Sequence, residues 1–226
     1  MRLELLSELL KELIKNSTSL LEEVRLLASN NKIERAMFLT VIAIEEMGKI
    51  NMYMNSIQYG KDLKEFWKRF NKYKTKHQFK IFRSLTFKKH MDLNFDFEGL
   101  EDLSKGIDRI KMSNIYVDIK GDEILTPFGT VNPEDYSNFY NFATELLNHH
   151  TTLLENGYYE VDFLRLMKEF YSNEEIQVLL SDLFDEKIGP EDYIERLMSI
   201  AITKEDDIFA QILLSGIYTN LAGEEI

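Results

Sequence analysis

Two adjacent glutamates and a lysine stand out because they follow an apolar stretch. Glu45 and Glu46 come directly after residues 36–44, in which only Thr40 is polar, and Lys49 lies one helical turn further on. Carboxylates that enter a core need cationic or hydrogen-bonding partners, or one of them must take up a proton. The group therefore suits two roles: an ion pair at the solvated end of a core helix, or a buried polar network that fixes neighbouring segments, with an active site as one place for such a network.

The helix that must position these residues is predicted over residues 32–56. At a spacing of three and four residues, one stripe of this helix carries Arg35, then apolar residues, then Glu45, Glu46 and Lys49. Lys49 can pair with either glutamate. A middle section that is apolar on every face is typical of the central helix of a bundle.

The histidines that such acids could orient are few. The chain has four histidines and no cysteine, which excludes disulfides, thiolate zinc sites and a cysteine nucleophile. His77 lies in a basic stretch, His90 directly follows that stretch, and the other two form the pair His149-His150. A di-metal carboxylate bundle would need Glu-x-x-His on two helices, and this motif does not occur. We therefore expect no metal and no other cofactor.

The basic stretch covers residues 61–89. It contains eleven lysines and arginines against two acids, with aromatic residues interleaved. Such a segment suits binding of RNA through its phosphates, with an affinity that falls as salt rises. Phe66, Phe70 and Tyr73 recur at helical spacing, so core packing explains the aromatic residues equally well.

The remaining sequence also predicts helices, so we expect an all-α bundle. Helices are expected over 3–30, with a break at 16–18, and over 100–112 and 133–155, while 114–128 forms a small hairpin or an ordered loop. From 157 onward the chain is helical with short breaks. We predict a helical domain at 1–155 and an acidic helical region at 156–226, packed on that domain or appended to it.

Charge divides the chain in the same way. Residues 1–120 carry a balance of +5 and residues 121–226 a balance of −17, so the total of −12 is a poor guide to partners. No stretch approaches the roughly 20 apolar residues of a membrane span, and the N-terminus lacks the features of a signal peptide. We expect a cytoplasmic protein that does not enter a membrane.

Three segments, in this order and spacing over about 32–135, resemble the AbiV family of abortive infection proteins, which belongs to the HEPN group of helical domains. They are Arg35 to Lys49 with Ala-Ile-Glu-Glu-Met-Gly-Lys at its end, His77-Gln-Phe-Lys80, and Tyr116-Val-Asp118 with Pro127 after it. The resemblance implies a helical bundle, often dimeric, that acts in bacterial defence against phage. The region from about 157 is not covered by it.

Many members of the HEPN group are metal-independent ribonucleases with an Arg-x(4–6)-His motif. This chain contains Arg83-x6-His90, but Ser84 stands where the group usually has Asn, Asp or His. The match also falls in the basic third segment, whereas the group usually has it in the last helix of the bundle. The resemblance therefore implies a possible endoribonuclease and leaves the catalytic set open.

The leading hypothesis is a toxin-like defence effector that acts on RNA or on translation. RNA cleavage needs a base near the ribose 2′-hydroxyl and a cation on the scissile phosphate. The candidate bases are His77 and His90, the candidate cations are Arg83, Lys80 and Lys49, and either Glu45 or Glu46 could orient the base. Arg35, Tyr116 and Asp118 are the further family-motif positions.

The alternatives belong to other classes. One is a non-enzymatic helical module that senses or binds a phage or host protein, with the acidic C-terminal half as its docking or autoinhibitory surface. Another is a helical scaffold whose polar networks are only structural. The resemblance to the HEPN group, in which dimers are common, implies a homodimer.

Overall fold

The structure is a computed structural model. It describes residues 2–58, 77–78, 80–81, 83–85, 97–113, 118–120, 123–127 and 131–184, together with 187, 192, 195–196 and 199–200. Most of the basic stretch, with His90, and also Tyr116 lie outside the described residues.

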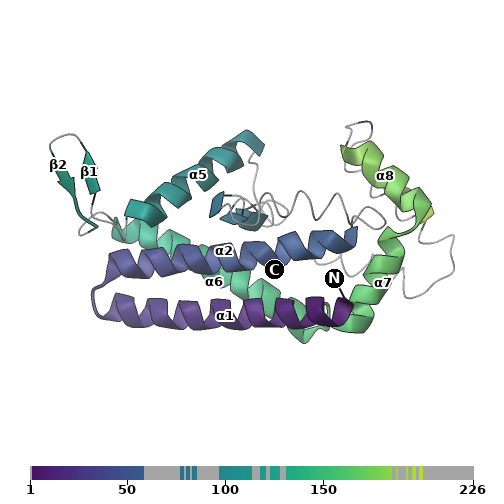
Figure 1. Cartoon of the computed structure of the whole chain (residues 1–226), viewed down its shortest axis with the longest axis horizontal. Helices are drawn as coiled ribbons and strands as arrows, with labels where there is room; N and C mark the ends of the chain where they lie inside the picture. Colours follow the sequence, from purple (N-terminus) through teal and green to yellow (C-terminus); the bar gives the residue numbers. More distant parts are fainter. Residues whose placement is uncertain are drawn as a thin grey trace.

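Two long helices, α1 (Leu3–Ser29) and α2 (Ile33–Gln58), form an antiparallel pair along the long axis of the molecule (Figure 1). The chain reverses between them in a tight turn in which Asn31 has a φ of 55°. Asparagine tolerates this left-handed conformation better than most residues. The predicted ends at Asn30-Asn31 are therefore confirmed.

The predicted break at residues 16–18 is wrong, because α1 runs through it without interruption. The Ser17 hydroxyl donates to the Leu13 carbonyl at 2.9 Å, and the Thr18 hydroxyl donates to the Ile14 carbonyl at 3.0 Å. Both side chains thus bond back to the preceding turn instead of capping a new helix. Ser17 is also fully buried, so packing against the neighbouring helices holds this part of α1.

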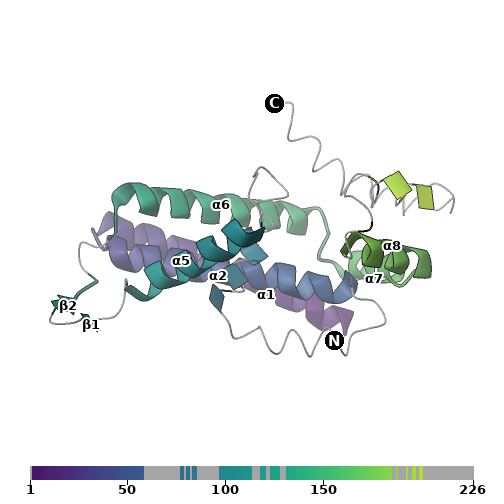
Figure 2. The ribbon, with the colours of Figure 1, turned by 90° about the horizontal axis from the view of Figure 1, so that it is seen from above.

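The third long helix, α6 (Pro133–Glu155), lies alongside the α1–α2 pair (Figure 2). It begins where the sequence predicted: the Asn132 side chain accepts a hydrogen bond from the Glu134 amide at 3.0 Å, and Pro133 is the first helical residue.

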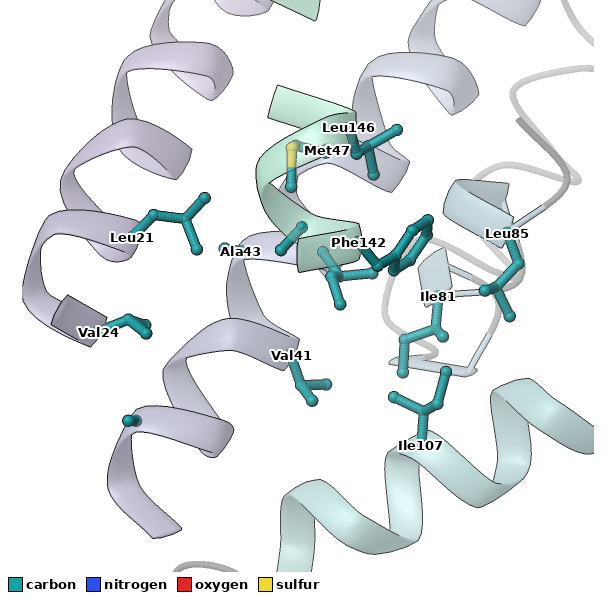
Figure 3. Close-up of a cluster of buried hydrophobic side chains, with 13 residues drawn as sticks. Leu21, Val24, Val41, Ala43, Met47, Ile81, Leu85, Ile107, Phe142 and Leu146 are labelled. Carbon is teal, nitrogen blue, oxygen red and sulfur yellow. The ribbon is translucent and has the colours of Figure 1, made fainter. Parts of the chain in front are cut away.

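The main core cluster forms between these helices (Figure 3). Its labelled members are Leu21 and Val24 from α1, Val41, Ala43 and Met47 from α2, Phe142 and Leu146 from α6, Ile107 from the helix α5 (Phe97–Ser113), and Ile81 and Leu85. Most residues in the middle of α2 are buried, and its remaining stripe, with Phe38 and Ile42, is partly buried. Helix α2 is therefore the central helix, as its all-round apolar sequence predicted.

The shorter elements lie on one side and at the two ends of this bundle (Figure 1). Helix α5 (Phe97–Ser113) packs on α2 and is followed by strands β1 (Asp118–Lys120) and β2 (Glu123–Leu125). The strands pair antiparallel, with Lys120 opposite Glu123, so the predicted segment forms a hairpin. Helices α7 (Val161–Tyr171) and α8 (Glu174–Phe184) follow α6 at the other end (Figure 1).

A second core cluster ties α7 to the start of α1. Tyr159 and Leu164 are buried among Leu6, Leu10 and Ile50. The salt bridge between Lys11 and Glu160, at 2.7 Å, lies at the same junction. The described part of the region after residue 155 therefore shares its core with the first two helices.

These elements confirm the predicted all-α class with one small hairpin. Within the described part of the chain, no helix has the length and apolar character needed to cross a membrane.

Candidate functional site

Glu45 is the centre of a polar cluster inside α2. Its side chain is only 3% exposed, yet both carboxylate oxygens have cationic or potentially cationic partners. Oε1 accepts from Lys111 Nζ at 2.6 Å, and Oε2 lies 2.6 Å from His77 Nδ1. A buried carboxylate needs such compensation because water no longer solvates it. The predicted solvated ion pair is therefore wrong for Glu45, and the predicted buried network is right.

The contact to His77 sets the form of the imidazole. An ionised carboxylate can only accept hydrogen bonds, so Nδ1 must carry a proton to donate to Glu45. In the neutral ring, Nε2 then keeps its lone pair. Glu45 is almost fully buried, whereas the His77 side chain is 52% exposed. His77 is thus held by a buried carboxylate, while part of its ring is accessible to solvent.

Lys80 lies next to the same carboxylate. Its Nζ is 4.0 Å from Glu45 Oε2, and its side chain is 11% exposed. Burial lowers the pKa of Lys80, and the charges of Lys49 and Lys111 act in the same direction, while Glu45 and Glu46 oppose this change. The Lys80 ammonium therefore gives up its proton more readily than an ordinary lysine.

Glu46 belongs to a separate, less buried pair. It forms a salt bridge with Lys49 and accepts from Asn16 Nδ2 at 3.2 Å. Of the two pairings open to Lys49, the structure has the one with Glu46. Burial raises the pKa of Tyr53, and the nearby Glu46 charge adds to this effect.

Gly48 explains how the described residues between 77 and 85 come so close to α2. A Cβ atom at this position would collide with the Lys80 carbonyl and lie 2.7 Å from the Ser84 hydroxyl oxygen. That hydroxyl donates to the Ile44 carbonyl at 2.6 Å, and Asn51 Nδ2 donates to the Arg83 carbonyl at 3.2 Å. The glycine of the Glu-Glu-Met-Gly-Lys motif thus makes room for the backbone that carries His77 and Lys80.

Two residues of the cluster, Lys111 and Asp108, were not predicted from the sequence. Both lie on α5, and their salt bridge measures 3.1 Å. The signal was a charge on an apolar stripe, because Lys111 follows the buried Ile107 by four residues. A lysine near the C-terminus of a helix is common, however, so this signal alone did not separate Lys111 from a solvated residue.

The other predicted positions are dispersed. Arg35 is exposed at the start of α2, and Asp118 lies in β1. Arg83 is near the cluster through its backbone, and Ser84 packs against α2. His90 and Tyr116 lie outside the described residues, so the Arg83-x6-His90 pairing stays a prediction. The described residues include no group of three or more His, Asp or Glu side chains arranged to hold a metal ion.

Comparison with known proteins gave one result. A family model described as AbiV, HEPN_AbiV, matches residues 5–148. The searches among curated proteins and among solved structures gave no match. The matched region contains Glu45, His77, Lys80, Asp108 and Lys111 and stops before α7.

Proposed function

Since this chain belongs to the AbiV family of abortive infection proteins, within the HEPN group, we propose that it is a defence effector that cleaves RNA without a metal ion. The proposal rests above all on one observation: the half-exposed His77 is held by the buried Glu45 at 2.6 Å. A histidine fixed by a carboxylate is the usual arrangement of a general base.

His77 is the proposed base. Nε2 takes the proton of a ribose 2′-hydroxyl while the 2′-oxygen attacks the adjacent phosphorus. The 5′-oxygen leaves with a proton from solvent, which gives a cyclic phosphate and a 5′-hydroxyl. Glu45 accepts from Nδ1 throughout and stabilises the imidazolium that forms. Lys80, 4.0 Å from the same carboxylate, offers positive charge to the phosphate.

The experiment is RNA cleavage by purified protein in the presence of a chelator. His77→Ala should abolish cleavage, and Glu45→Gln should reduce it strongly. His149→Ala is the matched control, because it removes a histidine from α6 outside the cluster, and it should leave the rate unchanged. Thermal unfolding of each variant checks that it is folded.

Three outcomes contradict parts of this proposal. If His77→Ala still cleaves and His90→Ala does not, the Arg83-x6-His90 motif is the active site and His77 is structural. If the wild type leaves RNA intact while His77→Ala loses phage protection, the alternative function, binding of a phage or host protein, is supported instead. If neither His77→Ala nor Glu45→Gln changes phage protection or RNA cleavage, the polar cluster around Glu45 serves only as a scaffold.

RNA binding through the basic stretch is the second part of the proposal. Each phosphate contacted by a lysine or arginine releases counterions, so the affinity should fall steeply with salt. Measuring the Kd of single-stranded RNA from 50 to 200 mM salt tests this, and an affinity independent of salt would exclude phosphate contacts as its source.

A further inference from the structure

We propose that Lys111 is a positioning residue of this site, which acts on His77 through Glu45. The inference rests on the proposed function, in which His77 is the base. Lys111 is almost fully buried, with a side chain that is 3% exposed, and it comes from α5, a helix distant in sequence from Glu45. Its ammonium donates to Glu45 Oε1, which leaves Oε2 for His77.

The contacts form a closed ring across three segments. Glu45 on α2 accepts from Lys111, Lys111 pairs with Asp108 at 3.1 Å, and Asp108 Oδ2 accepts from Gln78 Nε2 at 3.3 Å. Gln78 is the chain neighbour of His77, whose Nδ1 returns to Glu45. The segment carrying the base is therefore fastened twice, once directly to α2 and once through α5.

The ring fixes the orientation of the Glu45 carboxylate as well as its charge. A carboxylate with one cationic partner can rotate so that either oxygen faces that partner. Here Lys111 lies on Oε1, while His77 and the more distant Lys80 lie on Oε2. Loss of Lys111 therefore frees the carboxylate to turn away from His77 or closer to Lys80. In either case the Nδ1–H donor of His77 loses its fixed acceptor, and the reacting Nε2 is no longer held in place.

The test is the tautomer of His77 together with RNA cleavage in Lys111→Met. Nitrogen-15 NMR of the histidine rings reports which nitrogen carries the proton, and the spectrum of His77→Ala assigns the signal. The wild type should show His77 protonated at Nδ1 in the neutral form. Lys111→Met should shift the ring toward protonation at Nε2 and lower kcat about tenfold or more, with KM nearly unchanged.

Lys105→Met is the matched control. It removes a lysine from the same helix whose side chain is 42% exposed and pairs with Asp102, and it should change neither the tautomer nor kcat. Lys111→Arg keeps the charge and the donor, so it should restore both readouts at least in part.

The outcomes are separable from those of the proposed function. If the wild type does not cleave RNA but the tautomer depends on Lys111, the proposed function fails and the positioning role stands. An unchanged tautomer in folded Lys111→Met overturns the positioning role. Lys111→Gln is measured if Lys111→Met does not fold. If neither folds, Lys111 is a structural core residue and the inference is rejected.

Discussion

Glu45 and Glu46 are neighbours in sequence but differ in environment. The Glu45 side chain is 3% exposed with partners from two other segments, whereas that of Glu46 is 16% exposed and pairs with Lys49 on its own helix. Burial makes the first carboxylate dependent on its partners, because no water replaces a lost contact. The second remains closer to an ordinary helix ion pair.

Replacing each glutamate by glutamine should lower the free energy of unfolding by different amounts, because the two environments differ. Glu45→Gln leaves the buried Lys111 charge with Asp108 as its remaining ion-pair partner among the described residues, and it should lower the free energy of unfolding by about 3–5 kcal/mol. Glu46→Gln should cost about 1 kcal/mol or less. Urea denaturation measures both values, and equal costs would contradict the difference in environment.

His150 gives the protein a second residue-scale property, a dependence of stability on pH. Its Nδ1 lies 2.8 Å from the hydroxyl oxygen of Tyr159, and both side chains are buried. Burial lowers the pKa of His150 to about 3, and the neighbouring His149 adds a smaller effect. Burial also raises the pKa of Tyr159.

The sign of the pH effect follows from these values. Between about pH 6.5 and pH 3 the unfolded chain binds a proton at His150 that the folded chain does not, so acid favours unfolding. Within this window His150 should lower stability by about 1.4 kcal/mol for each pH unit. Urea denaturation at pH 7, 6 and 5 should show a shallower pH dependence for His150→Gln than for the wild type. Parallel curves would mean that His150 does not stay neutral in the fold.

At the scale of elements, the site depends on how closely residues 77–85 approach α2. The approach is set by Gly48, where a side chain has no room, and by the hydroxyl of Ser84 on the Ile44 carbonyl. Helix α5 closes the other side through Ile107 and Lys111. The close packing of the backbone at Lys80 and Ser84 against the backbone of α2 therefore positions the side chains of the polar cluster.

Gly48→Ala should push residues 80–84 away from α2. The added methyl group meets the Lys80 carbonyl, and overpacking of this kind costs about 1–3 kcal/mol. Gly106→Ala is the matched control, because it lies in the middle of α5 with no heavy atom within 4 Å of the added Cβ. It should instead stabilise the protein by about 0.5–1 kcal/mol.

Thermal unfolding gives the sign of both changes. Hydrogen exchange at residues 77–85 then shows whether the loss in Gly48→Ala is local to the site. Equal stabilisation by both substitutions would show that the chain passes Gly48 at a greater distance than the structure has.

At the scale of the whole molecule, the described part of the C-terminal region completes the bundle. Leu164 is fully buried on the α1–α2 pair, although α7 lies beyond the residues that the family model matches. The predicted boundary at residue 155 stays a prediction for the rest of that region. For α7, the shared cluster indicates that it unfolds together with the first two helices.

Leu164→Ala tests this unit directly. The lost contacts and the resulting cavity should cost about 2–5 kcal/mol, as should Leu146→Ala in the main cluster. Both variants should shift a single cooperative urea transition. Val178→Ala on α8, where the side chain is exposed, should change stability by less than about 0.5 kcal/mol. A separate early transition confined to Leu164→Ala would show that α7 is an independent unit.

Most helices of the described part of the chain could be predicted from the sequence, which left a hairpin or an ordered loop open over 114–128 and singled out the Glu-Glu-Met-Gly-Lys cluster. Period and capping residues act locally, so α2, α6 and the Asn132 cap could be predicted from neighbouring residues. The break in α1 was predicted wrongly for the same reason, because tertiary packing keeps Ser17 helical. The fold alone shows which glutamate is buried, which histidine it contacts, and that Lys111 reaches it from 66 residues away. Pairing over such separations depends on how the helices pack, and no local pattern in the sequence encodes that.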